Sequence, residues 1–406
     1  MRVAITGAMT AAALLLAACA TPSAPQGTQT EGTRPSVPAT TSADGHGPSG
    51  TPGSSHGSDP SQATPTSAPL RRGERFVTLR MPSSYTPKAP GPGTDDYRCF
   101  LLDPKLAQKA LVTGVNVLPG NADVVHHVIL FRLSPAQVAV AEQQDRESAG
   151  QGWTCFGGSG VENQDSSPDA APWLGAWAPG GGEQVLAPDL GIPLPQGSRI
   201  VMQVHYNLLA GRAPDTTAAK LRLADDNGSR TILQTVLLPG PVELPCRPGK
   251  TGALCSREAA VADVQARFGE RAGLTADYLN QACKGGVGPS PTQSCTRPIT
   301  EGATIRAAAG HMHLLGRSIT LTINQGRADE RTVLDIPVWD FDDQGSRPVS
   351  PGVKVGKGDT LTVTCTHDQS LRDMLPAFAG QPERYVVWGD GTTDEMCLGI
   401  VMVTRP

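Results

Sequence analysis

Histidine is the residue type in this chain whose spacing best suits chemistry. Six of the eight histidines lie after residue 70, and five of these six fall in three short apolar settings. The settings are Val125-His126-His127-Val128, Gln203-Val204-His205-Tyr206 and Gly310-His311-Met312-His313. One histidine in a strand is more often a hydrogen-bonded packing residue. Imidazole dominates transition-metal sites in proteins, however, so clustering of this kind predicts metal binding.

The spacing within each setting limits how two imidazoles can share one ion. Side chains two apart on a strand point to the same face, so His311 and His313 can bind one ion without distorting the backbone. His126 and His127 are neighbours and would face opposite ways on a regular strand. Both can bind the same ion only if the strand is bulged or frayed there; alternatively, one binds and the other packs.

Short β-strands must position these histidines. Apolar runs rich in β-branched residues and separated by turn residues predict antiparallel sheets. The runs are 76–79, 124–131, 199–206, 221–223, 231–238, 319–323, 333–336, 360–364 and 400–404. For a chain of 406 residues we predict an all-β fold of two antiparallel, jelly-roll-like β-sandwiches, with an N-terminal domain at 71–225 and a C-terminal domain at 226–406.

One segment departs from the strand pattern. Residues 241–297 hold four cysteines and the one clear helical stretch, 257–268, in which apolar residues recur at helical spacing. We predict a disulfide-stapled, partly helical insertion in the second domain, and the pattern assigns it no function.

The N-terminus predicts export. The apolar stretch 8–18 is too short to span a bilayer but suits the core of a signal peptide. It ends in Leu16-Ala17-Ala18-Cys19, which resembles the lipobox of bacterial lipoproteins. We expect a signal peptide at 1–18, lipidation of Cys19 and anchoring to the outer face of the bacterial cytoplasmic membrane; an ordinary secretory signal with a chance cysteine is the alternative. Residues 19–70, rich in Ser, Thr, Pro, Gly and Ala, predict a disordered tether.

Cysteine usage and charge exclude several classes of function. Eight cysteines remain beyond Cys19, an even number that predicts disulfides in an exported protein but leaves their pairing open. They are Cys99, Cys155, Cys246, Cys255, Cys283, Cys295, Cys365 and Cys397. The chain has no CxxC pair, which argues against a thiolate zinc site or a thioredoxin-type centre. A net charge of -4 without a basic stripe argues against nucleic-acid binding.

The ligand types favour copper, and the motifs resemble a copper family. Imidazole suits zinc, copper, iron and nickel, whereas an added thioether favours copper, especially Cu(I). In order along the chain, the motifs resemble those of the copper type II, ascorbate-dependent monooxygenases, the family of peptidylglycine α-hydroxylating monooxygenase and dopamine β-monooxygenase. The resemblance covers about residues 71–406. The matching motifs are His126-His127 with the following aliphatic run, Gln203-Val204-His205-Tyr206, 310–316 and Asp394-Glu395-Met396-Cys397. The segments 97–99, 339–342 and 358–365 give further support.

The resemblance implies a function and a set of ligands. It implies one copper in each sandwich, ascorbate as reductant, and hydroxylation of a substrate C–H bond with O2. By position it implies an electron-transfer copper on His126, His127 and His205, a catalytic copper on His311, His313 and Met396, and a disulfide between Cys365 and Cys397. It gives no role to Met312, Met402 or His367, which we interpret as structural.

Two departures from the family pattern bear on the substrate. The peptide-amidating members bind a substrate carboxylate with an Arg and a Tyr, at positions that are Ala309 and Ile400 here. Because neither side chain can bind a carboxylate, we expect a different small-molecule substrate. We expect a monomer with no nucleic-acid partner that contacts the membrane through its lipid anchor. The alternative function is a surface-anchored copper-binding or electron-transfer lipoprotein without catalytic activity.

Overall fold

Strands are the main regular secondary structure of the folded chain. The computed structural model describes residues 67–89, 93–161, 170–171, 173–283 and 288–406. These residues belong to one compact unit, which spans Ser61–Pro406. The predicted signal peptide, Cys19 and nearly all of the predicted tether lie outside the described residues, so these predictions remain expectations.

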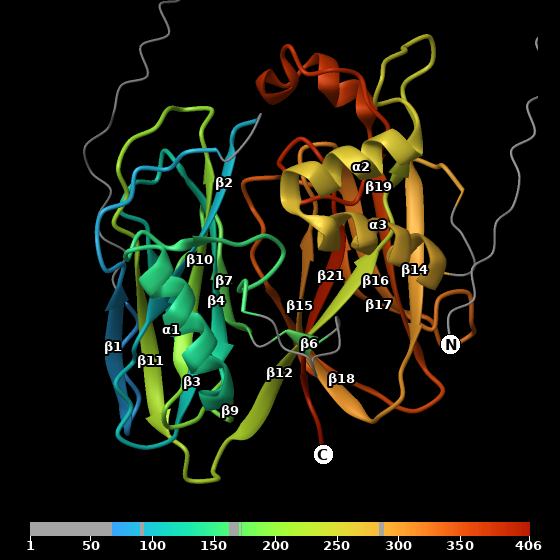
Figure 1. The fold of residues 1–406 in the computed structure, drawn as a ribbon. Helices are drawn as coiled ribbons and strands as arrows, with labels where there is room; N and C mark the ends of the chain where they lie inside the picture. Colours follow the sequence, from blue (N-terminus) through green and yellow to red (C-terminus); the bar gives the residue numbers. More distant parts are fainter. Residues whose placement is uncertain (1–66, 90–92, 162–169, 172, 284–287) are drawn as a thin grey trace, which may run out of the picture. The chain divides into compact units, whose positions relative to one another are not determined.

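The N-terminal strands form two sheets around a shared core (Figure 1). One sheet has the order β5-β2-β10-β4-β7, with β2 at Asp95–Leu102, β4 at Val125–Leu133, β5 at Trp153–Thr154, β7 at Trp173–Trp177 and β10 at Arg199–Asn207. The other has the order β1-β11-β3-β9, with β1 at Glu74–Arg80, β3 at Ala110–Leu118, β9 at Leu190–Leu194, β11 at Ala218–Asp225, and β8 at Gln184–Val185 beside β3. Phe100 and Met202 from the first sheet pack with Val115 and Leu221 from the second.

The C-terminal strands form a second pair of sheets with its own core (Figure 1). One has the order β12-β21-β15-β18, with β12 at Thr231–Gly240, β15 at Ala303–His311, β18 at Arg347–Val355, β21 at Cys397–Thr404, and β6 at Ala170–Ala171 beside β12. The other has the order β14-β19-β16-β17, with β14 at Thr292–Pro298, β16 at Gly316–Ile323, β17 at Arg331–Ile336 and β19 at Thr360–His367. Ile305 and Val401 from the first pack with Ile319 and Val363 from the second.

The fold is therefore all-β, as predicted, and the nine predicted runs all coincide with strands, apart from Val124, which stands just before β4. A short parallel pairing of β9 with β12 joins two of the sheets into one ten-stranded sheet. The predicted domain boundary falls at the link between β11 and β12, and it remains a prediction.

Helices are more numerous than the sequence pattern indicated. The predicted helix is α2 at Arg257–Phe268, and α1 at Val138–Glu147 and α3 at Glu270–Ala282 are additional. Helix α1 buries only Ala141 and therefore lacks a clear apolar stripe. The remaining short elements are η1 at Pro135–Gln137, η2 at Gln369–Asp373, η3 at Pro376–Phe378, and the paired strands β13 at Glu243–Leu244 and β20 at Val386–Val387.

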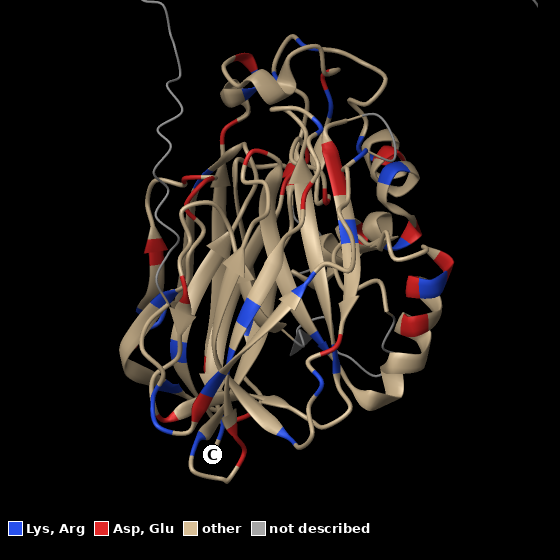
Figure 2. Cartoon of the chain, turned by 90° about the vertical axis from the view of Figure 1, so that its left-hand side faces the viewer, with Lys and Arg blue, Asp and Glu red and all other residues tan. Residues whose placement is uncertain are grey.

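Four disulfides resolve the pairing that the sequence left open. They join Cys99 to Cys155, Cys246 to Cys255, Cys283 to Cys295 and Cys365 to Cys397. The second and third flank the α2–α3 segment, so this segment is stapled at both ends as expected. Acidic and basic residues are interspersed in the view of Figure 2. Among the described residues, no helix combines the length and apolarity needed to cross a bilayer.

Candidate metal centre

A β-bulge lets two neighbouring histidines face the same way. Strand β10 pairs with β4 so that His205 lies opposite His127, but the next residue, Tyr206, lies opposite Val125. His126 is thus the extra residue of the bulge, and the alternation of the strand is broken at this point. The bulged alternative predicted from the sequence is the one that the structure adopts.

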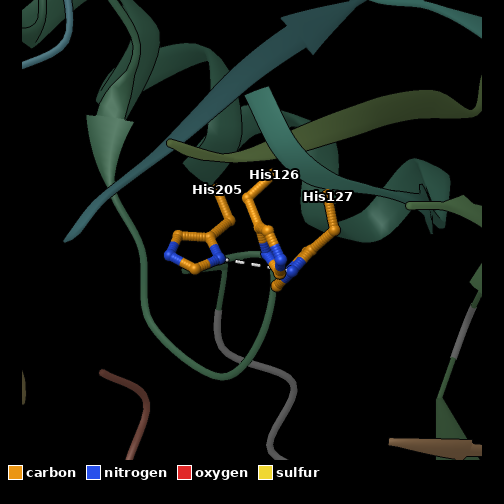
Figure 3. A group of neighbouring side chains, drawn as sticks. All are labelled: His126, His127 and His205. Atoms are coloured by element: carbon orange, nitrogen blue, oxygen red, sulfur yellow. Dashed lines mark hydrogen bonds between the residues drawn. The ribbon is translucent and has the colours of Figure 1, made fainter. Parts of the chain in front are cut away.

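The three imidazoles converge on one point (Figure 3). One ring nitrogen from each of His126, His127 and His205 lies within 4.8 Å of the others. The Nδ1 atoms of His127 and His205 are 3.2 Å apart. Two nitrogens held about 2.0–2.1 Å from one tetrahedral ion would be about 3.3 Å apart, so this spacing fits a shared metal ion.

The protonation of this cluster also suits a metal. Both ring nitrogens of His126 are buried and have no hydrogen-bond partner among the described residues. Burial, and then the charges of His205 and the other imidazoles, lower the pKa values of His126 and His127 well below the usual range for histidine. These rings therefore stay neutral, and neutral imidazole is the form that binds metals.

Residues of β2 hold the third imidazole. Asp95 Oδ1 accepts a hydrogen bond from His205 Nε2 at 2.8 Å, which leaves Nδ1 directed at His127. Tyr97 stacks on His205 with ring centroids 4.1 Å apart and an interplanar angle of 7°. A carboxylate bonded to the outer nitrogen of an imidazole is the usual arrangement around a protein-bound metal. Asp95 also accepts hydrogen bonds from the backbone N–H and the hydroxyl of Thr392.

The second pair of histidines lies where β15 ends. The rings of His311 and His313 are 5.2 Å apart. Strand β15 ends at His311, and His313 lies beyond it, before the turn into β16. The prediction that both lie within one strand was therefore wrong for His313. Because the chain leaves the strand there, another contact has to orient the second ring.

Hydrogen bonding leaves one nitrogen free on each ring of this pair. His311 Nδ1 bonds to the Gln344 side-chain oxygen, so its Nε2 remains available. The Nδ1 of His313 is buried without a partner among the described residues. Burial, and next the charge of His313, lower the pKa of His311 to about 3. Burial likewise lowers the pKa of His313, against the opposing effect of Glu395. Both rings are neutral, as metal ligands must be.

Glu395 connects the His313 turn to the methionine implied as a ligand. Its carboxylate accepts backbone N–H bonds from His313 at 3.1 Å and from Leu315 at 2.6 Å. The same carboxylate lies 3.3 Å from His367 Nε2, consistent with a structural role for that histidine. Met396 follows directly, is only 8% exposed, and precedes Cys397 of the Cys365–Cys397 disulfide.

The five imidazoles form a continuous group. The rings of His127 and His311 connect the two predicted ligand sets, with their centroids 5.8 Å apart. His126 also stacks on Phe341, two residues after Trp339 in the motif of 339–342, at 4.2 Å. The two sets of predicted ligands are thus close neighbours. How many ions they hold, and with which ligands, remains a prediction.

A cavity of about 1340 Å³ reaches both sets of ligands. His127, His311 and Met396 all line it. Ala309 and Ile400, the two positions that depart from the peptide-amidating pattern, lie directly opposite each other on β15 and β21 and line it too. Asp390 is a buried carboxyl in the lining, and burial, followed by the charge of Asp394, raises its pKa to about 7.

Comparison with known proteins connects this geometry to a chemistry. Residues 289–403 match the family profile described as "Copper type II ascorbate-dependent monooxygenase, C-terminal domain". This part of the chain resembles that domain. The matched region includes His311, His313 and Met396. For residues 289–403, the match supports the copper- and ascorbate-dependent monooxygenase family that the motifs indicated.

Similarity to solved structures is low. The major capsid protein P2 from bacteriophage PM2 is 8% identical, with 81% of this chain and 97% of that chain covered and a TM-score of 0.29. Allantoicase is 9% identical, with coverages of 78% and 90% and a TM-score of 0.18. A fucolectin from striped bass (Morone saxatilis) serum is 7% identical, with coverages of 77% and 84% and a TM-score of 0.16. Scores this low support no conclusion about function.

Several residues that shape the site were not predicted. Asp95 and Gln344 each fix one imidazole through its outer nitrogen, and Thr392 shares the carboxylate of Asp95. Asp95 stands two residues before the Tyr97-Arg98-Cys99 motif, and Gln344 stands two residues after the Trp339-Asp340-Phe341-Asp342 motif. Searching next to recognised motifs for carboxylates and amides could have found both residues as candidates.

Proposed function

We propose that this protein is a copper-dependent monooxygenase that hydroxylates a C–H bond of an apolar small molecule, using O2 and ascorbate. The main support is that a single cavity contacts both predicted ligand sets. His127 of the His126-His127-His205 cluster lines this cavity, and so do His311 and Met396 of the second set. The family match over residues 289–403 supports the same chemistry.

The reaction accounts for two kinds of site. The overall change is R–H + O2 + 2 e⁻ + 2 H⁺ giving R–OH + H2O, and ascorbate is oxidised as it supplies the two electrons. Copper, when bound, supplies the one-electron chemistry and the activation of O2. His126, His127 and His205 would hold one ion; burial would keep His126 and His127 neutral, and Asp95 would orient His205.

The second set would hold the ion next to the substrate. His311 and His313 offer two imidazoles, and Met396 offers a soft thioether that favours Cu(I). Gln344 orients His311, and Glu395 holds the turn that carries His313. Asp390 lines the cavity with a pKa near neutrality, so it can exchange protons, and the reaction consumes two.

The cavity lining argues for an apolar substrate. The Ala309–Ile400 pair presents only hydrocarbon where a carboxylate anchor would be needed. Trp173, Trp388 and Leu398 extend the apolar lining around Met396. Pockets of this composition bind ligands mainly through removal of apolar surface from water.

The proposal includes a location. Lipidation of Cys19 and export to the outer face of the bacterial cytoplasmic membrane follow from the N-terminal sequence alone. Replacement of Cys19 by Ser should release the protein from the membrane fraction, as assayed by fractionation and mass spectrometry of the N-terminal peptide. Retention of the variant in the membrane, with an unmodified N-terminus, would contradict the anchor.

Copper stoichiometry tests the two-ion proposal. The purified protein lacking residues 1–60 should bind close to two copper ions per chain, measured by elemental analysis after removal of free metal. A value of one would remove the proposal of two sites. His205→Phe should lower the value to about one, because it removes a ligand of one set and leaves the other set unchanged.

Substitution of Met396 tests the catalytic ligand set. Met396→Ile should remove most of the Cu(I) affinity of the second site, measured by competition with a chromogenic Cu(I) chelator. Met402→Ile is the matched control, since Met402 also lines the cavity but belongs to neither ligand set. Equal Cu(I) affinity in the two variants would show that Met396 is not a ligand.

Oxygen consumption separates the enzyme from a carrier. A monooxygenase should consume O2 with ascorbate at a rate that rises when an organic substrate is added, and the product mass should increase by one oxygen atom. A non-catalytic copper or electron-transfer lipoprotein would bind two ions and show no substrate-dependent rise. Screening a library of apolar compounds by product mass tests both outcomes.

A further inference from the structure

The α2–α3 segment forms part of the cavity wall. Phe268 at the end of α2, and Arg271, Ala272 and Thr275 on α3, line the cavity. Ala272 is only 7% exposed, so it faces the interior. The hydroxyl of Thr275 donates a hydrogen bond to the Arg271 carbonyl at 2.9 Å, which satisfies its polar group within the helix. The buried part of this wall is therefore apolar.

The same segment is attached to the loop that carries Met396. Arg267 forms two hydrogen bonds of 2.7 Å to the two carboxylate oxygens of Asp394, two residues before Met396. Ala272 and Phe268 belong to the apolar cluster that contains Met396 and Ile400. The wall is consequently held beside the proposed catalytic ligand and not at a remote end of the cavity.

Aromatic contacts continue the wall toward the first histidine cluster. Phe268 packs edge-on against Phe156 with ring centroids 5.0 Å apart, and Phe156 packs against Tyr97 at 5.6 Å. Tyr97 in turn stacks on His205. Phe268, Phe156 and Tyr97 all line the cavity. A substrate in the cavity would therefore lie against this aromatic series while its reacting C–H bond faces His311 and Met396.

The cationic side chains that line the cavity are poorly placed for an anionic substrate. Arg306 is paired with Asp189 at 2.9 Å, and Arg271 is exposed to solvent. Ala309 and Ile400, which line the cavity and share an apolar cluster with Met396, offer no anion-binding group. Burying a charged group without a partner is costly, so the cavity disfavours an anion near the ligands.

We propose that the α2–α3 segment is the substrate-selecting wall, and that the site accepts a bulky, uncharged apolar molecule whose size is limited by Ala272 and Thr275. This inference rests on the proposed monooxygenase function, because only that function makes the bound molecule a substrate. Its binding part can be tested separately from catalysis. The cavity volume of about 1340 Å³ exceeds the usual range of ligand pockets, about 300–1,000 Å³, and so suits a large ligand.

The test compares tryptophan substitutions on one helix. Ala272→Trp and Thr275→Trp place an indole ring inside the cavity, whereas Leu274→Trp places the same ring at a position that is 60% exposed and does not line it. The probe is N-phenyl-1-naphthylamine, which is apolar and uncharged, titrated by fluorescence into the copper-loaded protein lacking residues 1–60. The anionic 8-anilinonaphthalene-1-sulfonate, which shares its ring system, tests the charge preference.

We expect Ala272→Trp and Thr275→Trp to bind the neutral probe about tenfold more weakly than the parent protein, as removal of roughly 55 Å² of apolar contact would cause. Leu274→Trp should bind it as the parent protein does. Equal affinity in all three variants, or tighter binding of the sulfonate than of the neutral probe by the parent protein, would overturn the inference. Copper stoichiometry verifies folding; if Ala272→Trp fails to fold, Thr275→Trp decides.

Ascorbate-driven O2 consumption on the same proteins separates the two proposals. Suppose that Ala272→Trp and Thr275→Trp lose probe binding, and that no compound raises O2 consumption by the parent protein. This result would support the inference about the α2–α3 wall and reject the monooxygenase function. Substrate-dependent O2 consumption with unchanged probe binding in every variant would reject the wall and retain the enzyme.

Discussion

The ion pair between Arg267 and Asp394 allows a quantitative test of how the helical segment supports the Met396 loop. The side chain of Arg267 is 16% exposed and that of Asp394 is 2% exposed, and both carboxylate oxygens accept a hydrogen bond from the guanidinium. Replacing Arg267 by Met keeps the length of the side chain and removes its charge. The variant therefore leaves a buried carboxylate with fewer partners.

The remaining partners of Asp394 determine the magnitude. Breaking one side of a buried ion pair costs about 3–5 kcal/mol of unfolding free energy. Arg384 stays 3.6 Å from the carboxylate, and the Gly391 N–H stays 3.2 Å from it. Because these two groups retain part of the compensation, we expect Arg267→Met to cost about 3 kcal/mol, the lower end of the range.

The effect of pH on the stability difference between the parent protein and Arg267→Met can also be predicted. Burial alone would raise the pKa of Asp394, but Arg267 outweighs it, and the pKa is below its usual value. A depressed carboxyl pKa stabilises the fold at pH values above the unfolded pKa of about 3.9, and this contribution is lost as the pH falls through the folded pKa. In the variant without Arg267, burial should raise the pKa of Asp394 above its unfolded value. Asp394 then destabilises the folded variant increasingly as the pH rises.

The stability gap between parent and variant should therefore be largest at pH 7 and narrow toward pH 4.5. Urea denaturation of the oxidised, metal-free protein, followed by tryptophan fluorescence, measures it. Arg405→Met is the control, because its pair with Glu301 is exposed and should be worth less than about 1 kcal/mol. A cost below about 1 kcal/mol for Arg267→Met, or a gap that widens in acid, would refute the argument.

Three further predictions use other contacts. Replacing Cys365 and Cys397 by Ser opens a loop of 32 residues and should lower the unfolding free energy by about 3.7 kcal/mol in urea titrations; a loss below about 1 kcal/mol would contradict this. Asp95→Asn should weaken copper binding at the His205 cluster by about 10- to 100-fold in chelator competition, and unchanged affinity would show that the carboxylate does not support that ligand. The pKa of His311 is about 3 in the folded protein, whereas that of an unfolded histidine is about 6.5. As the pH falls from 7.5 to 5.5, the metal-free protein should therefore lose about 1.4 kcal/mol of unfolding free energy through this residue. An identical dependence of stability on pH in His311→Gln would refute this.

Local pattern was sufficient to predict the strands and the histidine positions. Period-two runs such as 319–323 predicted strands because alternation places the apolar residues on one face, and Ile319, Leu321 and Ile323 of β16 are all buried. The adjacent pair His126-His127 required a bulge if both rings were to share a site, and β4 is bulged at that point. These inferences succeeded because each depends on residues that are neighbours along the chain.

The contacts that orient the ligands could not be predicted in the same way. Asp95 and Thr392 are 297 residues apart, and no periodicity connects them. The position of His313 beyond β15 depends on Glu395, which binds the turn from 82 residues away. Helix α3 was missed because its buried face consists mostly of Ala and Gly, which give little contrast to its other faces.

The loop before β21 has three independent attachments, and this arrangement bears on the function of the site. Asp95 and Tyr97 bind its residues Thr392 and Asp390, Arg267 binds Asp394, and Glu395 binds the turn after β15. Each attachment comes from a different element, so the position of the Met396 side chain depends on all of them together. A thioether is a weak ligand with several rotatable bonds, and its contribution to copper binding depends on being held in place beforehand. Loss of any one attachment should therefore reduce Cu(I) affinity at the His311-His313 pair while the two sheet cores remain folded.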